Sequence, residues 1–271
     1  MFSETLIAVF IISLCAEYMD ATIGMGYGTT LTPILLLVGF SPLQIVPAIL
    51  LSQFISGIFA SFLHQGAGNV FFDFKNDTEN KIVKRLGKLG YLPRSNASKV
   101  VMVLVISSII GVFISIIIAL NLPVFYLKLY IGIMIVAMGL IIILKHETNA
   151  QFSWKKIIGL GVLASFNKGI SGGGYGPLIV SGQILSGVET KKSIGITALA
   201  EGVTCFIGVI TYFIVGTDID WLLAPYLVIG SLISVPLSVY TVKRMPIKKF
   251  TLIIGFATTL LGIFSLIKLM N

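Results

Sequence analysis

The sequence predicts an all-α membrane protein built from two inverted repeats, each a re-entrant or broken helical hairpin followed by three transmembrane helices. Of the 271 residues, 56% are hydrophobic and 11% are charged, whereas an ordinary soluble domain has about 25% charged residues. Apolar runs near the length that crosses a bilayer, about 20 residues, recur along the chain. A glycine cluster followed by Tyr-Gly interrupts this apolar sequence twice, at Gly24 and at Gly172.

The first repeat is predicted over residues 1–145 and opens with a hairpin over 5–38. The sequence IGMGYGT, residues 23–29, lies near the tip of this hairpin. Three apolar runs of spanning length follow, which predict helices at about 43–63, 100–120 and 122–144. The polar, basic stretch 64–98 is predicted to be a cytoplasmic loop between the first two of these helices.

The second repeat is predicted over residues 155–271 and opens with a hairpin over 157–186. The sequence SGGGYGP, residues 171–177, is flanked there by runs of about 15 and 10 residues, which rise roughly 22 and 15 Å as helix. Two such pieces suit a hairpin better than two full crossings of a core of about 30 Å. Helices are then expected at about 193–216, 222–242 and 247–270.

An internal duplication explains why the two glycine clusters resemble each other. A shift of 148 positions superposes seven identical pairs without a gap: Ala16 and Ala164, Gly24 and Gly172, Gly26 and Gly174, Tyr27 and Tyr175, Gly28 and Gly176, Gly39 and Gly187, Leu51 and Leu199. The same shift superposes Asp20 on Lys168 and Gln53 on Glu201. Three full crossings per half give the halves opposite orientations, which is the architecture of many secondary transporters.

The distribution of basic residues predicts the orientation in the membrane. Lysine and arginine gather between apolar runs, in 75–99, 145–156 and 243–249 and at Lys191 and Lys192. The connections near 39–42, 121–123 and 217–220 contain no basic residue, so the positive-inside rule sets them outside. We therefore expect a multi-pass protein of the cell inner (cytoplasmic) membrane with both termini outside. The first apolar run lacks a basic start and a cleavage site and is expected to remain in the chain.

The glycine clusters are candidate substrate sites. Irregular backbone at membrane depth survives where it is buried in protein or lines a wet cavity, and a helix that starts after each cluster directs its N-terminus toward the bilayer centre. Free N–H groups and partial positive charge at such an end bind anions. The candidate substrate-binding residues are Gly24, Gly26, Tyr27, Gly28, Thr29, Thr30, Lys168, Ser171, Gly172, Gly173, Gly174, Tyr175 and Gly176. The spacing does not fit the dinucleotide-binding motif.

Four ionisable residues lie within the predicted spans, where each is costly unless it is paired or wetted: Glu17, Asp20, Lys168 and Glu201. Lys168 either sets an ammonium beside the anion site, forms a structural pair with Asp20, or extends toward water. Asp20 and Glu201 are candidates for proton coupling or for structural contacts between helices. Glu17 lies one turn before Asp20 and shares its helix face.

The chain resembles the sulfite exporter TauE/SafE family, also called the TSUP permeases. The residues that carry the resemblance are Gly172-Gly173-Gly174-Tyr175-Gly176-Pro177 with Gly195-Ile196-Thr197-Ala198, the looser first copy Gly24-Met25-Gly26-Tyr27-Gly28 with Pro33, and His64 with Gly68-Asn69-Val70. Ala48 to Ser52 departs from the usual pattern of the first copy. The resemblance implies a secondary transporter for small anions, commonly sulfur-containing: sulfite, sulfoacetate or other organosulfonates.

The expected partners are therefore a small anionic substrate and the lipid bilayer, with protons as a candidate coupling ion. A proton-coupled cation transporter or channel that uses Glu17, Asp20 and Glu201 is the alternative, and Lys168 argues against it. The chain has two histidines and no Cys/His spacing of a metal site, so we expect no enzyme, no metal and no cofactor. Because the basic residues lie between spans, we expect no nucleic acid; a homo-oligomer is compatible with the sequence.

Overall fold

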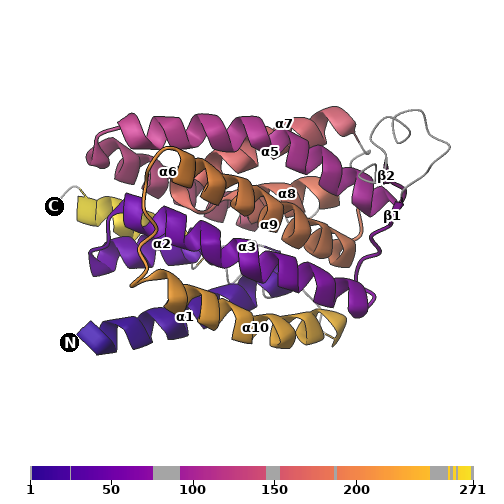
Figure 1. Cartoon of the computed structure of the whole chain (residues 1–271), viewed down its shortest axis with the longest axis horizontal. Coiled ribbons are helices and arrows are strands. Elements are labelled where there is room, and N and C mark those ends of the chain that lie inside the picture. Colours follow the sequence, from indigo (N-terminus) through magenta and orange to yellow (C-terminus); the bar gives the residue numbers. More distant parts are fainter. Residues whose placement is uncertain are drawn as a thin grey trace.

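The computed structural model describes residues 2–24, 26–75, 92–144, 153–185, 188–244, 256, 259–260 and 262–269. Nine helices with stated bounds make up a bundle in this part of the chain (Figure 1): α1 (Phe2–Ile23), α2 (Tyr27–Val38), α3 (Pro42–Gly66), α5 (Asn96–Asn121), α6 (Val124–Leu144), α7 (Trp154–Ser171), α8 (Tyr175–Leu185), α9 (Thr190–Ile214) and α10 (Ala224–Arg244). The two-residue strands β1 (Phe74–Lys75) and β2 (Leu92–Pro93) pair antiparallel at one end of the bundle.

Six of these helices contain stretches long and apolar enough to cross a membrane: Thr5–Ile23, Pro42–Gly66, Asn96–Asn121, Val124–Ile141, Thr190–Ile214 and Ala224–Arg244. The prediction of an all-helical, multi-pass protein is confirmed. The two hairpins contain helices broken at the expected places, but re-entry of these hairpins stays a prediction. Most of the predicted helix 247–270 and of the predicted loop 64–98 lies outside the described residues.

Capping side chains explain where two of the spans begin. Ser41 precedes Pro42 at the start of α3, and its N–H donates to Gln44 Oε1 at 2.9 Å. Proline suits this first helical position, because the N–H that it lacks would have no partner within the helix. At the start of α5, Ser95 Oγ accepts the N–H of Ser98 at 3.0 Å. Such side-chain caps satisfy N–H groups that the first helical turn leaves free.

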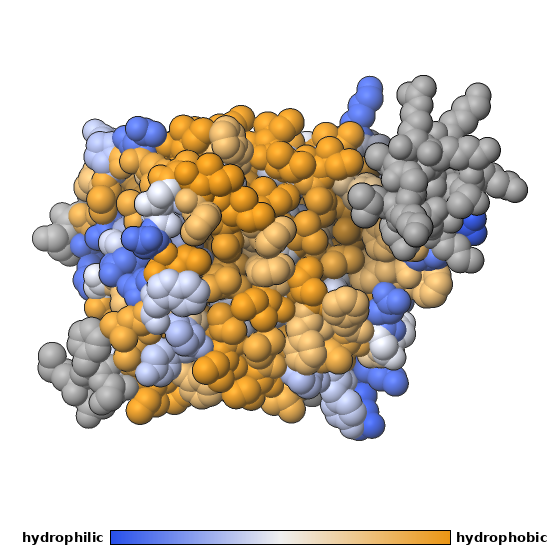
Figure 2. Space-filling model, in the orientation of Figure 1, coloured by the Kyte–Doolittle hydropathy of each residue, from blue (hydrophilic) through white to orange (hydrophobic). Residues whose placement is uncertain are grey.

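The surface has the pattern of a membrane protein. Figure 2 shows a hydrophobic band across the middle of the molecule, with hydrophilic residues gathered at its two ends. On α5, Ile106, Ile109, Ile110 and Phe113 are each more than half exposed. Their spacing of three or four residues puts them on one helix face. Such a continuous exposed apolar face suits contact with lipid.

Helix boundaries repeat along the chain with the shift of 148 positions. The shift carries the bounds of α3 onto those of α9, the last residue of α1 onto the last residue of α7, and the first residue of α2 onto that of α8. The most extensive helix contacts are those of α5 with α7, α1 with α10, and α3 with α9. These correspondences are the ones expected of a duplication, whose inverted arrangement stays a prediction.

Hydrogen bonds between residues at the connections show which connections lie at the same end of the bundle. Gln44 Nε2 donates to Asp220 Oδ2 at 3.1 Å, which joins two of the connections predicted outside. Lys191 Nζ donates to the carbonyl of Lys243 at 3.3 Å, which joins two of those predicted inside. The predicted grouping of these connections is consistent with the structure, while the side of the membrane that each faces stays a prediction.

Candidate functional site

Each hairpin is interrupted by glycines whose backbone conformation requires glycine. In the first break Gly24 has φ of 75° and Gly26 has φ of 135°; in the second, Gly172 has φ of 74° and Gly174 has φ of 79°. A residue with a Cβ rarely adopts these values, whereas glycine does so at little cost. The breaks therefore arise from the local sequence, at the two places that the glycine clusters predict.

The two breaks lie against each other in the interior. A Cβ added to Gly28 would collide with the carbonyl oxygen of Gly172 and lie 2.8 Å from Gly173 Cα. A Cβ added to Gly173 would lie 2.7 Å from Gly28 C and from Thr29 N. Thr32 Oγ1 also donates to the carbonyl of Ser171 at 2.9 Å. Segments more than 140 positions apart thus meet backbone to backbone, which only residues without side chains allow.

All thirteen candidate substrate-binding residues are buried, and all lie in the breaks, in the last turn of α7, or in the first turns of α2 and α8. The hydroxyl groups of Tyr27 and Tyr175 form hydrogen bonds with side chains of neighbouring helices. The Tyr27 hydroxyl shares hydrogen bonds with Ser13 Oγ at 2.9 Å and Ser52 Oγ at 2.8 Å, and the Tyr175 hydroxyl accepts one from Thr204 Oγ1 at 3.4 Å.

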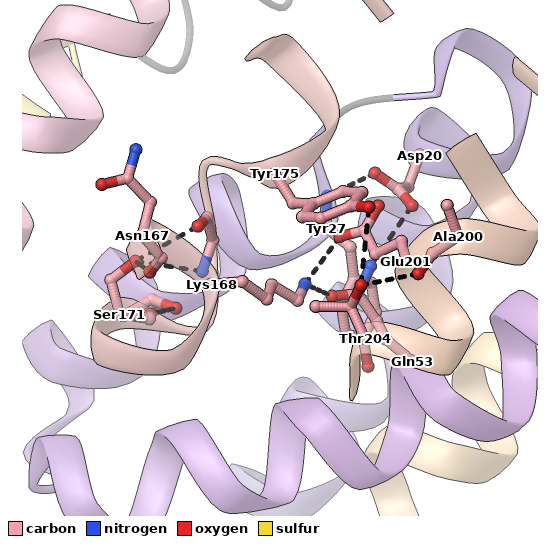
Figure 3. Close-up of polar contacts among 12 residues, drawn as sticks. Asp20, Tyr27, Gln53, Asn167, Lys168, Ser171, Tyr175, Ala200, Glu201 and Thr204 are labelled. Carbon is pink, nitrogen blue, oxygen red and sulfur yellow. Dashed lines mark hydrogen bonds and ion pairs between the residues drawn. The ribbon is translucent and has the colours of Figure 1, made fainter. Parts of the chain in front are cut away.

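Four side chains form a central polar network: Asp20, Gln53, Lys168 and Glu201. Lys168 is 0% exposed, and Figure 3 shows its side chain extending from α7 toward the other helices. Its Nζ donates to Glu201 Oε1 at 2.7 Å and to Gln53 Oε1. Gln53 Nε2 donates in turn to Asp20 Oδ2 at 3.3 Å. The network therefore runs from α1 through α3 to α7 and α9.

The members of the central polar network correspond to one another in the two halves. The shift of 148 positions that carries Asp20 onto Lys168 also carries Gln53 onto Glu201. A structural pair of Lys168 with Asp20 was one of the alternatives for this lysine; in the structure Lys168 pairs with Glu201 and reaches Asp20 through Gln53. The sequence reasoning left Gln53 out of the candidate site, although its alignment with Glu201 was the signal that could have found it.

The two helix N-termini at the breaks differ in the charge beside them. Tyr27 N, at the start of α2, donates to Asp20 Oδ1 at 3.3 Å, so a carboxylate of the protein already lies at this helix end. Lys168 holds the corresponding position of the second half, where Gly173 N donates to Ser171 Oγ at 3.1 Å. A lysine cannot neutralise a helix N-terminus, because both are positive. The first break therefore has a carboxylate at its helix end, whereas the second has a lysine at the corresponding position, and this lysine is paired with Glu201.

A small cavity borders the central polar network. It is lined by Glu17, Asp20, Ser56 and Glu201 among others, and its volume of about 10 Å³ is the space of about one water. Glu17 Oε2 and Ser56 Oγ are buried with no hydrogen-bond partner among the described residues. Within the same part of the chain, no three His, Cys, Asp or Glu side chains are arranged to hold a metal ion.

Comparison with known proteins identifies the family. The model of the family described as "Sulfite exporter TauE/SafE" matches residues 86–265. The chain belongs to this family. The matched region contains the second break, Lys168 and Glu201, and begins after the first break. Among curated relatives, the probable membrane transporter protein YtnM of Bacillus subtilis (strain 168) is 23% identical over 266 residues, which cover 93% of this chain and 79% of YtnM. No solved structure matches the chain.

Family membership confirms the resemblance and the class of protein. The chain is a multi-pass membrane transporter of the TauE/SafE family. Membership of a transporter family implies that the protein moves a small substrate and is not an enzyme.

Proposed function

We propose that the protein is a secondary transporter that moves a small anion across the cytoplasmic membrane through a site between the two glycine-rich breaks. We further propose that the anion contains sulfur, as sulfite, an organosulfonate or a related species, which the description of the family favours. The observation that carries the proposal is Lys168, a fully buried lysine in the last turn of α7, just before the second break.

The comparison of the two halves supports this role for Lys168. A buried charge is costly and is kept where it is paired or functional. In the first half, Asp20 supplies the anion at the α2 N-terminus. In the second half, a substrate anion would take the corresponding place, between the α8 N-terminus and the ammonium of Lys168. Both contributions, helix end and ammonium, favour an oxyanion over a cation.

The arrangement of helices supports a transporter with inverted repeats. The bounds of α3 match those of α9, and the contact of α5 with α7 corresponds to that of α10 with α1; both contacts join the two halves, as expected if the halves are related by a pseudo-two-fold axis. Transporters of this architecture bind substrate at broken helices near the interface of the repeats. The proposal includes the two opposed hairpins and both termini outside.

The alternative, a proton-coupled cation transporter or channel, has one observation in its favour. Glu17, Asp20 and Glu201 all line one small cavity, and a cation there would relieve the excess negative charge. Lys168, whose ammonium bonds Glu201 directly, opposes a second cation at this place. Protons, as the coupling ion, fit these carboxylates better than a cation as cargo.

Thermal unfolding of the detergent-purified protein tests the proposal, because a ligand that binds only the folded state stabilises it by about 2.7 kcal/mol at 100 times its Kd. The panel consists of sulfite, thiosulfate, sulfate, sulfoacetate, taurine, carboxylates and cations. We expect a sulfur anion to raise the melting temperature, and Lys168→Met to abolish that shift. The matched control is Lys192→Met, at a surface lysine paired with Glu189, which keeps the shift.

Two outcomes would overturn the proposal: stabilisation by a cation with no response to any anion, or an anion response that survives Lys168→Met. Because Lys168→Met leaves Glu201 buried without its partner, the double variant Lys168→Met/Glu201→Gln is measured as well. The double variant removes both charges and keeps the test valid if the single variant does not fold.

A further inference from the structure

The buried lysine that is proposed to bind the anion already forms an ion pair with a carboxylate of the protein. The inference from this pair rests on the function proposed above. We propose that Glu201 occupies Lys168 in place of the substrate, that the anion displaces Glu201, and that Glu201 takes up one proton when it is displaced. Anion binding is then coupled to proton binding at the residue that the anion replaces.

In the structure the ion pair is buried, and the protein itself occupies the ammonium of the lysine. Lys168 Nζ and Glu201 Oε1 are 2.7 Å apart, and the two side chains are 0% and 7% exposed. Gln53 Oε1 accepts a second hydrogen bond from the same ammonium. An ammonium has three N–H donors, and two of them are used within the protein. An anion that approaches Lys168 therefore competes with Glu201 for the charge.

Charge decides what happens to the displaced carboxylate. Glu201 forms the direct ion pair with Lys168, and Glu17 and Asp20 line the same small cavity as Glu201. Adding an anion without a proton would leave a further negative charge unpaired, and a buried ion without its partner strongly destabilises the protein. A proton from water, bound to a carboxylate oxygen of Glu201, removes this penalty. One O–H bond forms, the anion replaces Glu201 as acceptor of the Lys168 N–H, and no electrons are transferred.

Glu201 is a better candidate for the proton than Asp20. The two oxygens of Asp20 accept hydrogen bonds from Tyr27 N and Gln53 Nε2. An anion at the second break does not compete for either of these donors, so Asp20 keeps both. Glu201, by contrast, loses its ammonium partner when the anion binds.

The groups that face Glu201 come from each helix packed against α9. They are Lys168 of α7, Glu17 and Asp20 of α1, Tyr175 of α8, Gln53 and Ser56 of α3, and Cys205 one turn along α9. In α5, the remaining neighbour, the ionisable residue is Lys99 in the first turn. Of these groups, Glu17 and Asp20 line the same small cavity as Glu201.

Isothermal titration calorimetry of the full-length protein in detergent tests the coupling. Methanesulfonate and thiosulfate serve as probe anions, because their charge is constant between pH 5 and 9. Titration in two buffers of different ionisation enthalpy counts the protons taken up. We expect one proton per anion, and an affinity that falls about tenfold for each pH unit over the range in which the proton is taken up.

Variants separate the role of Glu201 from general effects of charge. Glu201→Gln should bind the anion with an affinity independent of pH and without proton uptake. The matched control is Glu189→Gln, an exposed glutamate that also pairs with a lysine, and it should behave as the wild type. Glu201→Asp, which keeps a carboxylate, should keep the proton uptake and serves if the glutamine variant does not fold.

The inference is overturned if the wild type binds the probe anions through Lys168 with no proton uptake and no dependence on pH. Proton uptake that survives Glu201→Gln but is lost in Glu17→Gln would overturn it too. Failure of the proposed function looks different: the wild type binds neither probe anion at any pH, and both proposals fall together.

Discussion

Replacing Gly28 with alanine adds one methyl group where the two helix breaks touch. The added carbon would collide with the carbonyl oxygen of Gly172 and lie 2.8 Å from Gly173 Cα, whereas ordinary contacts of a Cβ are 3.4–4 Å. Overpacking a core usually costs about 1–3 kcal/mol. Because the obstructing atoms belong to backbone and cannot rotate away, we expect the upper end of this range, ~3 kcal/mol.

The assay is thermal unfolding of the detergent-purified protein, followed by the fluorescence of its two tryptophans. For chains of 150–250 residues a loss of ~1 kcal/mol lowers the melting temperature by about 2–4 °C, so Gly28→Ala should lower it by roughly 6–12 °C. Gly173→Ala should show a similar loss, because its Cβ would lie 2.7 Å from Gly28 C.

The control for both variants is Gly66→Ala. Gly66 ends α3, and a Cβ added there meets no atom within 4 Å. Surface changes of this kind usually stay within about 0.5 kcal/mol, so the melting temperature should hardly move. If Gly28→Ala and Gly66→Ala have the same melting temperature, the two breaks are not in contact and the site proposed between them has no structural basis.

Two further predictions concern the buried charges, and both use the same unfolding assay. Lys168→Met and Glu201→Gln should each cost about 3–5 kcal/mol, because each leaves its partner buried and uncompensated, and the double variant should cost clearly less than the sum; additive losses would contradict the ion pair. Glu17→Gln should leave the melting temperature unchanged or raise it, since Glu17 Oε2 has no hydrogen-bond partner among the described residues; a loss as large as that of Glu201→Gln would contradict this.

Much of the candidate site could be predicted from the sequence, because its signals are local. Clustered glycines in apolar sequence predict a helix break, and Gly24, Gly26, Gly172 and Gly174 all have positive φ. Ionisable residues in apolar runs are rare and costly, which singled out Lys168 before its surroundings were known. The duplication could also be predicted, because it is visible in the order of residues along the chain. The helix bounds repeat with the same shift of 148 positions.

The sequence by itself thus determined the class of protein, its helices and the places where two of them break. Tertiary structure decided which side chains meet there. Lys168 and Gln53 are 115 positions apart, and hydropathy and spacing carry no information on contacts over such a separation. The partner of Lys168 is Glu201 and not Asp20, because Asp20 is held at the N-terminus of α2. Which carboxylate faces the ammonium depends on how α1, α3, α7 and α9 pack, and that packing exists only in the folded bundle.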